Sequence, residues 1–312
     1  MKIVLLDALT LGDSDLSVFD RLGEFSAYAT TSDAQRLAHI ADNDVIITNK
    51  VSIDRTVIEA NPQLKLICIA ATGTNNVDLL AAKESGVAVK NVSGYSTESV
   101  AQSTFSMLFQ LVQQTRYYDH YTQSKAWCNS PSFTHIDIPF TEIKGKRWGI
   151  IGFGAIGQRV AEIAQVFGCE LCYYSTSGKN TQQAIKQVDL TTLLASCDII
   201  SIHAPLNAQT ENLIDDKALA LLKKGAVILN LGRGGIIDES AMANALDQSD
   251  IYHGTDVLAV EPMLAEHPYF SVQAQSRLLI TPHTAWASSQ AREKLLSEIV
   301  NNIREGCKSF DR

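Results

Sequence analysis

The stretch Arg147-Trp-Gly-Ile-Ile-Gly-Phe-Gly-Ala-Ile-Gly157 decides the fold, because an apolar run enters a turn that holds three glycines. Residues 158–167 then carry apolar side chains at helical spacing, so strand, turn and helix follow in order. Gly152 permits a tight turn, Gly154 lets a pyrophosphate approach the backbone, and Gly157 allows the helix to pack closely. A glycine-rich turn without a ligand is the alternative, but the order of the elements favours a dinucleotide-binding domain.

Length and composition narrow the class of protein. The 312 residues exceed a typical single domain, and a hydrophobic content of 46% without low-complexity tracts indicates a folded globular chain. A net charge of −8 argues against nucleic acid or an anionic membrane as a partner. No apolar run reaches a membrane span, and the N-terminus turns acidic at Asp7, too early for a signal peptide. We expect a cytoplasmic protein with no nucleic-acid or membrane partner.

Short β-rich runs divide the chain into two series. The first series consists of residues 3–6, 45–48, 66–70 and 87–89. The second series consists of residues 148–151, 171–174, 198–203, 226–230, 252–257 and 278–281. Helical stretches alternate with the runs, as they do in parallel sheets. We predict an α/β fold: a Rossmann-type doubly wound parallel sheet plus a second, smaller flavodoxin-like α/β domain, with a cleft between them.

The helical patterns suggest where the domains meet. A strong amphipathic helix begins near Ser96 or Thr97, which are both plausible caps. The periodicity fades over residues 118–146, which we interpret as a connecting arm, and a closing helix over 288–303 is expected to pack back on the first series. We therefore predict a discontinuous substrate (catalytic) domain of residues 1–98 with 286–312, and a dinucleotide-binding Rossmann domain of residues 99–285.

The cofactor preference depends on the end of the strand after the glycine turn. An acidic residue that binds the adenosine ribose is expected about 20 residues after the turn. Ser175 stands there instead, and Lys179 follows it. Because a carboxylate would repel a 2′-phosphate, its absence removes the usual discrimination against NADP, and Lys179 would add attraction. The sequence therefore predicts NAD(P), with NAD and NADP both open.

Three polar side chains follow the last three strands of the second series. They are Arg233, Glu261 and His283, and the carboxyl ends of parallel strands meet at the edge where ligands bind. An arginine fork can hold a carboxylate, a histidine can exchange a proton, and a carboxylate can orient the imidazole. Glu-Pro alone is a common turn and a single histidine is more often structural. Together, after the glycine turn, the three indicate hydride transfer to a 2-oxo acid.

The six cysteines include one CxxC pattern, Cys169-Glu-Leu-Cys172. It lies where a strand would point the two thiols to opposite faces of a sheet. We therefore expect neither a redox role nor a metal role for this pair, and no metal ion in the protein.

Several further segments extend the pattern over nearly the full length. They are Ala71-Thr-Gly-Thr-Asn-Asn-Val-Asp78, Gly94-Tyr-Ser-Thr-Glu-Ser-Val-Ala-Gln102, His203-Ala-Pro-Leu206, Asn230-Leu-Gly-Arg-Gly-Gly235, Asp256-Val-Leu258 and Thr281-Pro-His-Thr-Ala-Trp-Ala287. With the glycine turn and Glu261-Pro262, they make the sequence resemble the D-2-hydroxyacid dehydrogenase family. Within that family it is most similar to the glycerate dehydrogenases, also called hydroxypyruvate reductases.

The resemblance implies a role for each matching residue. Arg233 would bind the substrate carboxylate and polarise its carbonyl, His283 would be the acid or base, and Glu261 would hydrogen-bond His283. Backbone N–H groups of the substrate loop, Thr72, Gly73 and Thr74, would bind the substrate carboxylate as a small anion nest. The implied cofactor contacts are Thr104, Gly152, Gly154, Ala155, Ile156, Gly157, Ser175, His203, Pro205, Leu231, Gly232 and Asp256.

The substrate stays open within a short set of alternatives. Reduction of hydroxypyruvate or glyoxylate is the leading hypothesis. Lys50 would help an anion enter or lie solvated, and Trp286 would wall the pocket or pack the closing helix. Another 2-hydroxy acid, either lactate-like or phosphoglycerate, and a dinucleotide-sensing corepressor-like binding protein are the alternatives. Residues 127–140 resemble the family's intersubunit arm, which implies a homodimer.

Overall fold

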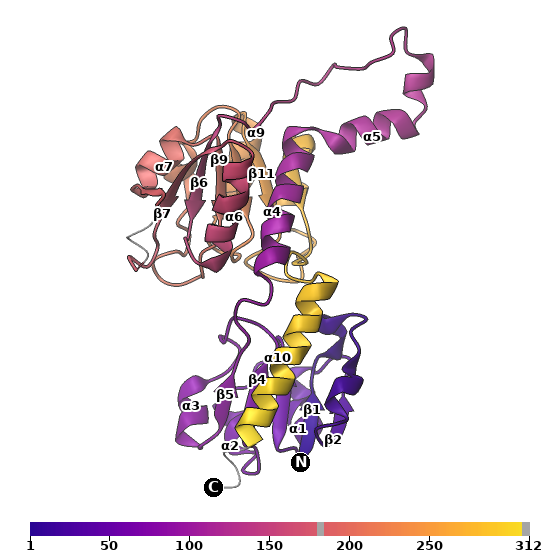
Figure 1. The fold of residues 1–312 in the computed structure, drawn as a ribbon, viewed down its shortest axis with the longest axis vertical. Coiled ribbons are helices and arrows are strands. Elements are labelled where there is room, and N and C mark those ends of the chain that lie inside the picture. Colours follow the sequence, from indigo (N-terminus) through magenta and orange to yellow (C-terminus); the bar gives the residue numbers. More distant parts are fainter. Residues whose placement is uncertain (180–183, 308–312) are drawn as a thin grey trace. The chain divides into compact units, whose positions relative to one another are not determined.

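The computed structural model describes residues 1–179 and 184–307, which form two compact units (Figure 1). Unit 1 contains Met1–Ser96 and the chain from Ala287 onward, whereas unit 2 is Thr97–Trp286. The sequence predicted a boundary between the two domains after residue 98 and another after residue 285. The last residues of the predicted substrate domain, 308–312, lie outside the described residues. Within the described ranges, no helix combines the length and the apolar character that a bilayer crossing requires.

Unit 1 is built on a five-stranded parallel sheet of order β2-β1-β3-β4-β5. Its strands are β1 (Lys2–Leu5), β2 (Glu24–Ala27), β3 (Val45–Thr48), β4 (Leu66–Ile69) and β5 (Ala88–Lys90). Its helices are η1 (Ala8–Leu11), η2 (Leu16–Phe19), η3 (Asp33–Gln35), α1 (Arg36–Ile40), α2 (Arg55–Glu59), α3 (Leu79–Glu84) and α10 (Ser289–Cys307). This strand order is the flavodoxin-like one, which confirms the predicted fold of the smaller domain.

Strand β2 was absent from the prediction, which gave this sheet only four strands. Its sequence Glu24-Phe-Ser-Ala27 is mostly exposed and lies at the edge of the sheet, paired with β1 alone. The central strands β3 and β4 are buried throughout and carry continuous apolar runs. An edge strand lacks that signal because only one of its sides is paired and its side chains reach solvent.

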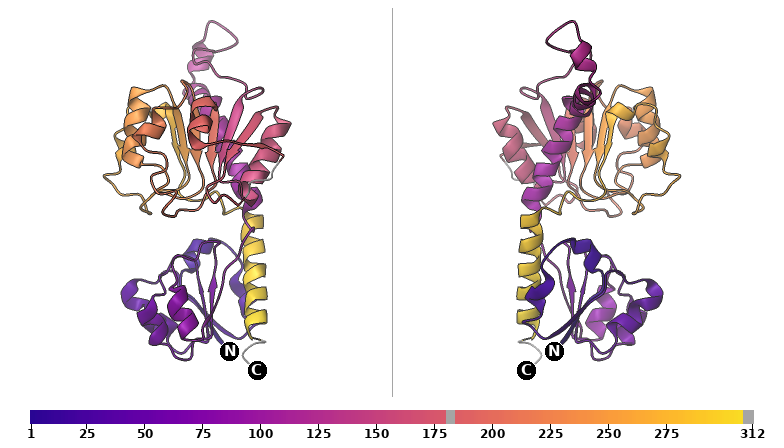
Figure 2. Two further views of the ribbon diagram at one scale, coloured as in Figure 1. Left: turned by 90° about the vertical axis from the view of Figure 1, so that its left-hand side faces the viewer. Right: turned by 90° about the vertical axis from the view of Figure 1, so that its right-hand side faces the viewer.

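Helix α10 comes last in the chain and packs against β4 of unit 1 (Figures 1 and 2). The approach is close, since a β-carbon at Gly306 would lie 2.8 Å from Cδ2 of Leu66. At the other end of the helix, Nη1 of Arg292 donates to the carbonyl oxygen of Leu11 at 2.9 Å and to Oδ1 of Asp13 at 2.5 Å. These bonds tie α10 to the segment that follows β1.

Unit 2 contains a seven-stranded parallel sheet of order β12-β11-β10-β9-β6-β7-β8. Its strands are β6 (Arg147–Ile151), β7 (Glu170–Tyr174), β8 (Lys186–Gln187), β9 (Ile199–Ile202), β10 (Val227–Asn230), β11 (Tyr252–Thr255) and β12 (Leu278–Ile280). The order reverses at β6, as in a doubly wound Rossmann fold, so that prediction is confirmed. The prediction missed β8, a two-residue edge strand with both side chains exposed.

Helices cover both faces of this sheet (Figures 1 and 2). The helices of unit 2 are α4 (Thr97–Val112), α5 (Thr115–Gln123), η4 (Ala126–Asn129), α6 (Ala155–Val166), α7 (Leu190–Ser196), α8 (Asp216–Leu219), α9 (Glu239–Gln248), η5 (Pro268–Phe270) and η6 (Gln275–Arg277). Of these, α5 extends away from the sheet (Figure 1), and neither α5 nor η4 buries a residue. Helices α4 and α6 pack over Trp148 and Tyr173 on one face, while α7, α8 and α9 pack on the other. Burial of both faces makes the central strands apolar throughout.

The segment after α4 is more regular than predicted. Residues 118–123 belong to α5, although no residue of this helix is buried. The ring of Tyr121 stacks on His135 at 3.7 Å between centroids, and the hydroxyl of Tyr117 hydrogen-bonds Nε2 of His135 at 2.7 Å. The chain that follows the helix therefore folds back onto it, which a search for a buried helical face cannot detect.

The CxxC cysteines lie on opposite faces of the unit 2 sheet, as predicted. Cys169 belongs to the core beneath α4 and α6, whereas Cys172 belongs to the core beneath α7. Sγ of Cys169 donates to the carbonyl oxygen of Ile143 at 3.3 Å, and Sγ of Cys172 lies 3.4 Å from Sγ of Cys197. The two cysteines of the pattern therefore have different neighbours.

Candidate active site

The glycine turn between β6 and α6 has the shape that a dinucleotide requires. Gly152 has a φ of +89°, and a β-carbon there would lie 2.7 Å from the backbone nitrogen of Ala204. A β-carbon at Gly157 would overlap the carbonyl oxygen of Gly152. Gly154 precedes α6, makes no side-chain cap, and has open space where a β-carbon would be. The first N–H groups of α6 are therefore available to a phosphate.

The other predicted cofactor residues lie around the same edge of the sheet. His203 and Pro205 follow β9, Leu231 and Gly232 follow β10, and Asp256 follows β11. Thr104 is buried within α4, where its hydroxyl donates to the carbonyl oxygen of Val100 at 2.8 Å. Ala155 and Ile156 form the first turn of α6.

His203 carries buried polar atoms with no partner. Both ring nitrogens are buried and make no hydrogen bond to the part of the chain that the structure describes. Burial lowers the pKa of His203 to about 3, so the ring is neutral and carries one donor and one acceptor. Unsatisfied buried groups are rare in folded proteins, and a ligand at the sheet edge would satisfy them. The orphaned ring thus fits a bound dinucleotide, as the glycine turn does.

Asp256 fixes the chain that carries the predicted catalytic histidine. Its buried carboxylate accepts from the hydroxyl of Thr281 at 2.5 Å and from the backbone nitrogens of Thr284 and Ala285 at 2.9 Å each. Burial raises the pKa of Asp256, while these hydrogen bonds oppose the shift. The end of β11 and the segment after β12 are therefore held together on both sides of His283.

His283 and Glu261 form a direct hydrogen-bonded pair. Nδ1 of His283 lies 2.7 Å from Oε2 of Glu261, with the two side chains 24% and 32% exposed. Oε1 of Glu261 accepts from the backbone nitrogen of Leu258 at 2.9 Å. His283 has a φ of 54°, uncommon for a non-glycine residue, and its N–H donates to the carbonyl oxygen of Asp256 at 2.8 Å. Because Nδ1 is engaged, Nε2 is the ring nitrogen available for proton exchange.

Arg233 follows strand β10, and its guanidinium forms no ion pair within the described residues. Asn230, which is 2% exposed, shapes the turn by donating to the carbonyl oxygen of Arg233 at 2.9 Å and accepting from the nitrogen of Gly232 at 3.1 Å. Nη1 of Arg233 donates to the carbonyl oxygen of Gly232 at 2.8 Å. No carboxylate among residues 1–179 and 184–307 pairs with this guanidinium, which leaves donors for an anionic ligand.

The predicted substrate loop of unit 1 follows β4. The hydroxyl of Thr72 donates to the carbonyl oxygen of Val92 at 3.0 Å, and Nδ2 of Asn91 donates to the carbonyl oxygen of Thr72 at 2.6 Å. These bonds hold the loop, while the N–H groups of Thr72, Gly73 and Thr74 find no acceptor in the described residues. Successive free N–H groups of this kind suit an anion.

Lys50 lies at the carboxyl edge of the unit 1 sheet. It lines a pocket of about 650 Å³ formed by the segments after β1, β2 and β3. The carboxylate of Asp7 accepts from the backbone nitrogens of Asn49 at 2.9 Å and Lys50 at 2.6 Å. A buried acid therefore fixes the backbone from which the Lys50 side chain extends.

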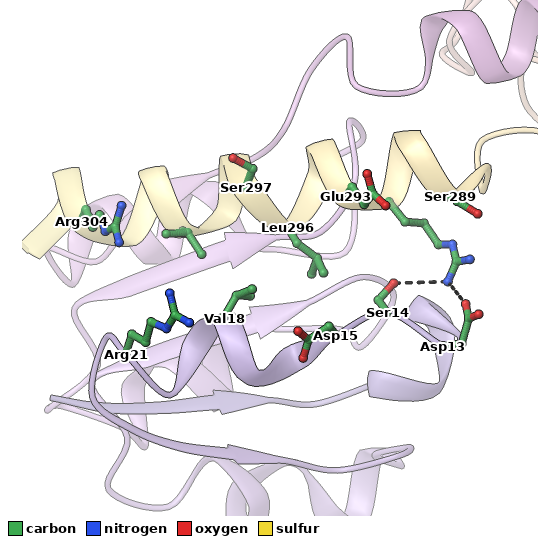
Figure 3. A pocket seen from close by; sticks show the side chains of 12 residues that line it. Asp13, Ser14, Asp15, Val18, Arg21, Ser289, Glu293, Leu296, Ser297 and Arg304 are labelled. Carbon is green, nitrogen blue, oxygen red and sulfur yellow. Dashed lines mark hydrogen bonds and ion pairs between the residues drawn. The ribbon is translucent and has the colours of Figure 1, made fainter.

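A second groove in unit 1, of about 660 Å³, lies between η2 and α10 (Figure 3). Arg21 and Arg304 lie opposite each other toward one end, and Asp13 is bonded at the other. None of the residues predicted to bind substrate or cofactor lines this groove. It therefore forms no part of the candidate active site.

The remaining predicted residues have simpler surroundings. Trp286 is half-buried and packs against the core beneath α4 and α6. Ser175 directly follows β7, which pairs with β6 beside the glycine turn, and Lys179 is exposed in the same segment. No group of three metal-binding side chains occurs within the described residues.

Two residues that the sequence did not single out, Glu239 and His267, bond the loop that carries Glu261. Glu239 begins α9 and accepts from the backbone nitrogen of Ala259, and it pairs with His267 across 28 positions of sequence. The sequence shows only an acidic residue in the first turn of a helix, which has a common explanation in the helix dipole. Nothing in the pattern connects it to the loop that carries Glu261.

Comparisons with known proteins agree with this architecture. Residues 105–285 match the model of the D-isomer specific 2-hydroxyacid dehydrogenase NAD-binding domain. The chain is 34% identical to a hydroxypyruvate reductase of Blautia hydrogenotrophica, covering 98% of this chain and 96% of the relative. It is 32% identical to a glycerate dehydrogenase of Methylorubrum extorquens, covering 97% and 95%. A solved acyclic imino acid reductase in complex with NADPH and D-Arg superposes with a TM-score of 0.87 at 30% identity, covering 99% and 98%.

Two α/β units with parallel sheets, a dinucleotide turn and the match to an NAD-binding domain define a nicotinamide-dependent oxidoreductase. The matching residues of unit 2 and the full-length relatives assign it more narrowly. The chain belongs to the D-isomer specific 2-hydroxyacid dehydrogenase family.

Proposed function

We propose that the protein reduces hydroxypyruvate or glyoxylate to the corresponding D-2-hydroxy acid with NADH or NADPH. The observation that carries the proposal is the 2.7 Å contact between His283 and Glu261. Arg233 follows the neighbouring strand β10, and its guanidinium forms no ion pair within the described residues. A hydroxypyruvate reductase and a glycerate dehydrogenase among the full-length relatives support this choice of substrate.

Each catalytic residue has a role that follows from its chemistry. The nicotinamide, when bound, supplies the hydride that reduces the keto carbon. Arg233 holds the substrate carboxylate through two parallel hydrogen bonds and polarises the carbonyl. His283 transfers the proton on Nε2 to the carbonyl oxygen, which becomes the hydroxyl group. Glu261 accepts from Nδ1 and stabilises the protonated ring before the transfer.

The same proposal assigns the other predicted residues to cofactor and substrate. Gly152, Gly154 and Gly157 would hold the phosphates of the cofactor, and the ring nitrogens of His203, which have no partner in the described residues, would bind it as well. In unit 1, the N–H groups of Thr72, Gly73 and Thr74, which have no acceptor among the described residues, would bind the substrate carboxylate, and Lys50 would attract the anion. Trp286 favours short substrates by occupying volume beside the catalytic segment.

Steady-state turnover with a panel of keto acids tests the proposal. Hydroxypyruvate, glyoxylate, pyruvate and phosphohydroxypyruvate are compared with both reduced cofactors, and the product is resolved by chiral chromatography. The expected result is the highest kcat/KM for hydroxypyruvate or glyoxylate, with D-glycerate as the product from hydroxypyruvate. A preference for pyruvate would indicate a lactate-type enzyme. Tight cofactor binding without turnover would instead indicate a dinucleotide-sensing protein.

The proposed cofactor range includes NADP because Ser175 replaces the expected acid. Ser175→Asp is expected to lower kcat/KM for NADPH by about 10–100-fold, through repulsion of the 2′-phosphate, while kcat/KM for NADH is nearly retained. Initial rates with both cofactors measure the change. Ser177→Asp, which adds the same charge to an exposed position of the segment, is the control. Equal losses with both cofactors, or no loss, would contradict a role of position 175 at the ribose.

We also propose a homodimer formed through the arm, defined as residues 127–140. This segment exposes large apolar side chains, with Trp127 49%, Phe133 90% and Ile136 72% exposed. Apolar surface gathered on one segment is typical of an interface. Light scattering is expected to give about twice the 34.0 kDa of one chain, and a Phe133→Asp and Ile136→Asp double variant is expected to give one chain. A monomeric wild type would refute this assembly.

The cytoplasm remains our proposed compartment. Cys68, Cys128, Cys169, Cys172 and Cys197 are all free thiols in the described part of the chain. Free cysteines suit a reducing compartment, where disulfides are rare. Subcellular fractionation with an antibody to the protein tests the assignment, and recovery outside the cytoplasmic fraction would overturn it.

A further inference from the structure

Glu239 joins the start of α9 to the loop of residues 258–267, which carries Glu261. Oε1 of Glu239 accepts from the backbone nitrogen of Ala259 at 2.7 Å, and Oε2 lies 2.8 Å from Nε2 of His267. The first bond holds one end of the loop and the second holds the other end. A single carboxylate, with its side chain 15% exposed, therefore closes the loop against α9.

His267 is arranged so that its bond to Glu239 has a fixed direction. Its Nδ1 accepts from the backbone nitrogen of Tyr269 at 3.2 Å, so Nε2 carries the proton and donates to Glu239. His267 is itself buried and caps the 3-10 helix η5. Both ring nitrogens are thus satisfied, and rotation of the ring would break two bonds.

The closed loop is in direct contact with the catalytic residues. The backbone of Leu258 lies against Gly234, where a β-carbon would overlap the carbonyl carbon of Leu258. Gly234 immediately follows Arg233 in the sequence. The nitrogen of Leu258 donates to Oε1 of Glu261, whose Oε2 bonds His283. Ala259, held by Glu239, is the next residue after Leu258.

We propose that Glu239 and His267 are positioning residues for the reaction, which hold the 258–267 loop so that Glu261 contacts Leu258 and His283 at the same time. The proposal rests on the proposed function, since it assigns these residues to the same acid–base pair. The side chain of Glu261 is 32% exposed, and Glu261 lies in the loop itself, outside any helix or strand. Without the Glu239–His267 pair, the loop would sample positions in which the Glu261 carboxylate turns to water.

Two variants remove the pair while keeping other bonds. His267→Asn retains an oxygen that can cap η5, but its side chain is too short to place a donor where Nε2 bonds Glu239. Glu239→Gln retains an acceptor for Ala259 but presents an amide where His267 needs an acceptor. Asp247→Asn is the matched control, because Asp247 also lies on α9 and holds chain segments, at Gln273 and Ala274, away from the Glu261 loop.

We expect kcat to fall by about tenfold in both variants, while KM and the cofactor Kd stay nearly unchanged. This loss is smaller than the roughly 10²-fold that a 1 Å misplacement of a reacting group can cause. The loss is expected in kcat because a displaced Glu261 no longer orients the ring of His283, which acts in the chemical step and not in binding. Glu261 and Asp256, two carboxylates that interact with His283, are altered in neither variant. Asp247→Asn is expected to keep kcat, KM and the cofactor Kd.

Ring-nitrogen NMR of His283 in the cofactor-bound protein gives a readout that does not need turnover. The resonance of the proton on Nδ1, which reports the hydrogen bond to Glu261, is expected to shift in both variants and to match wild type in Asp247→Asn. An unchanged resonance and an unchanged kcat in folded His267→Asn or Glu239→Gln would overturn the positioning role, even if the wild type reduces keto acids. A wild type that reduces no keto acid would refute the proposed function, whereas a shifted resonance in the variants would still support the positioning role.

Discussion

His283→Ala is expected to lower kcat for keto-acid reduction by about 10²–10⁴-fold, because the general acid is removed and water must supply the proton. Binding of the reduced cofactor is expected to stay near normal, since His283 bonds Glu261 and the backbone of Asp256 and lies apart in sequence from the glycine turn. Single-turnover rates at saturating substrate measure the loss, and cofactor fluorescence gives the Kd.

Glu261→Gln keeps His283 as the proposed acid but removes the carboxylate that bonds its ring. The substituted amide could still accept from the nitrogen of Leu258 but carries no charge to stabilise a protonated His283, so a loss smaller than that of His283→Ala is expected. The comparison is informative because residues that act as a unit give non-additive losses. A His283→Ala enzyme with near-wild-type kcat would place the proton source elsewhere and would remove the basis for the pair's role.

The sequence predicted the centre of each sheet better than its edges. Strands β3, β4, β9 and β10 are buried on both faces and read as continuous apolar runs, so composition alone locates them. Strands β2 and β8 lie at sheet edges with exposed side chains and give no such signal. Helix α5 is stabilised by Tyr117 and Tyr121 contacting His135, which is a contact between positions 14 to 18 residues apart.

In the site, too, the sequence predicts features of single segments but not contacts between residues that are far apart in the chain. Arg233, Glu261 and His283 were predicted because each follows a strand, and strand ends share an edge. The 2.7 Å contact between Glu261 and His283 spans 22 positions and comes from the fold. Glu239 and His267 bond each other across 28 positions, and their other partners are backbone groups, which every residue carries, so neither kind of partner can be read from the sequence.

The second large effect is expected from Arg233→Lys, with a loss in kcat/KM on the order of 10²–10³-fold. A guanidinium offers two parallel N–H groups to a carboxylate and a further donor to the carbonyl, whereas an ammonium is a point charge that cannot reproduce this fork. The charge is conserved, so attraction of the anion at long range is retained. Most of the loss should therefore appear in kcat, where polarisation of the carbonyl matters, more than in KM.

The turn that carries Arg233 is held by Asn230, so Arg233→Lys tests the side chain and not the shape of the turn. Asn230 bonds the backbone of Gly232 and Arg233, so the turn keeps its shape when the side chain changes. Within residues 1–179 and 184–307, the side-chain bond lost with the guanidinium is the one from Nη1 to the carbonyl oxygen of Gly232. In an Arg233→Ala variant, added guanidinium should restore part of the rate while added alkylammonium should not. Equal rescue by both cations, or undiminished turnover of Arg233→Lys, would show that charge alone suffices and would exclude the two-point clamp.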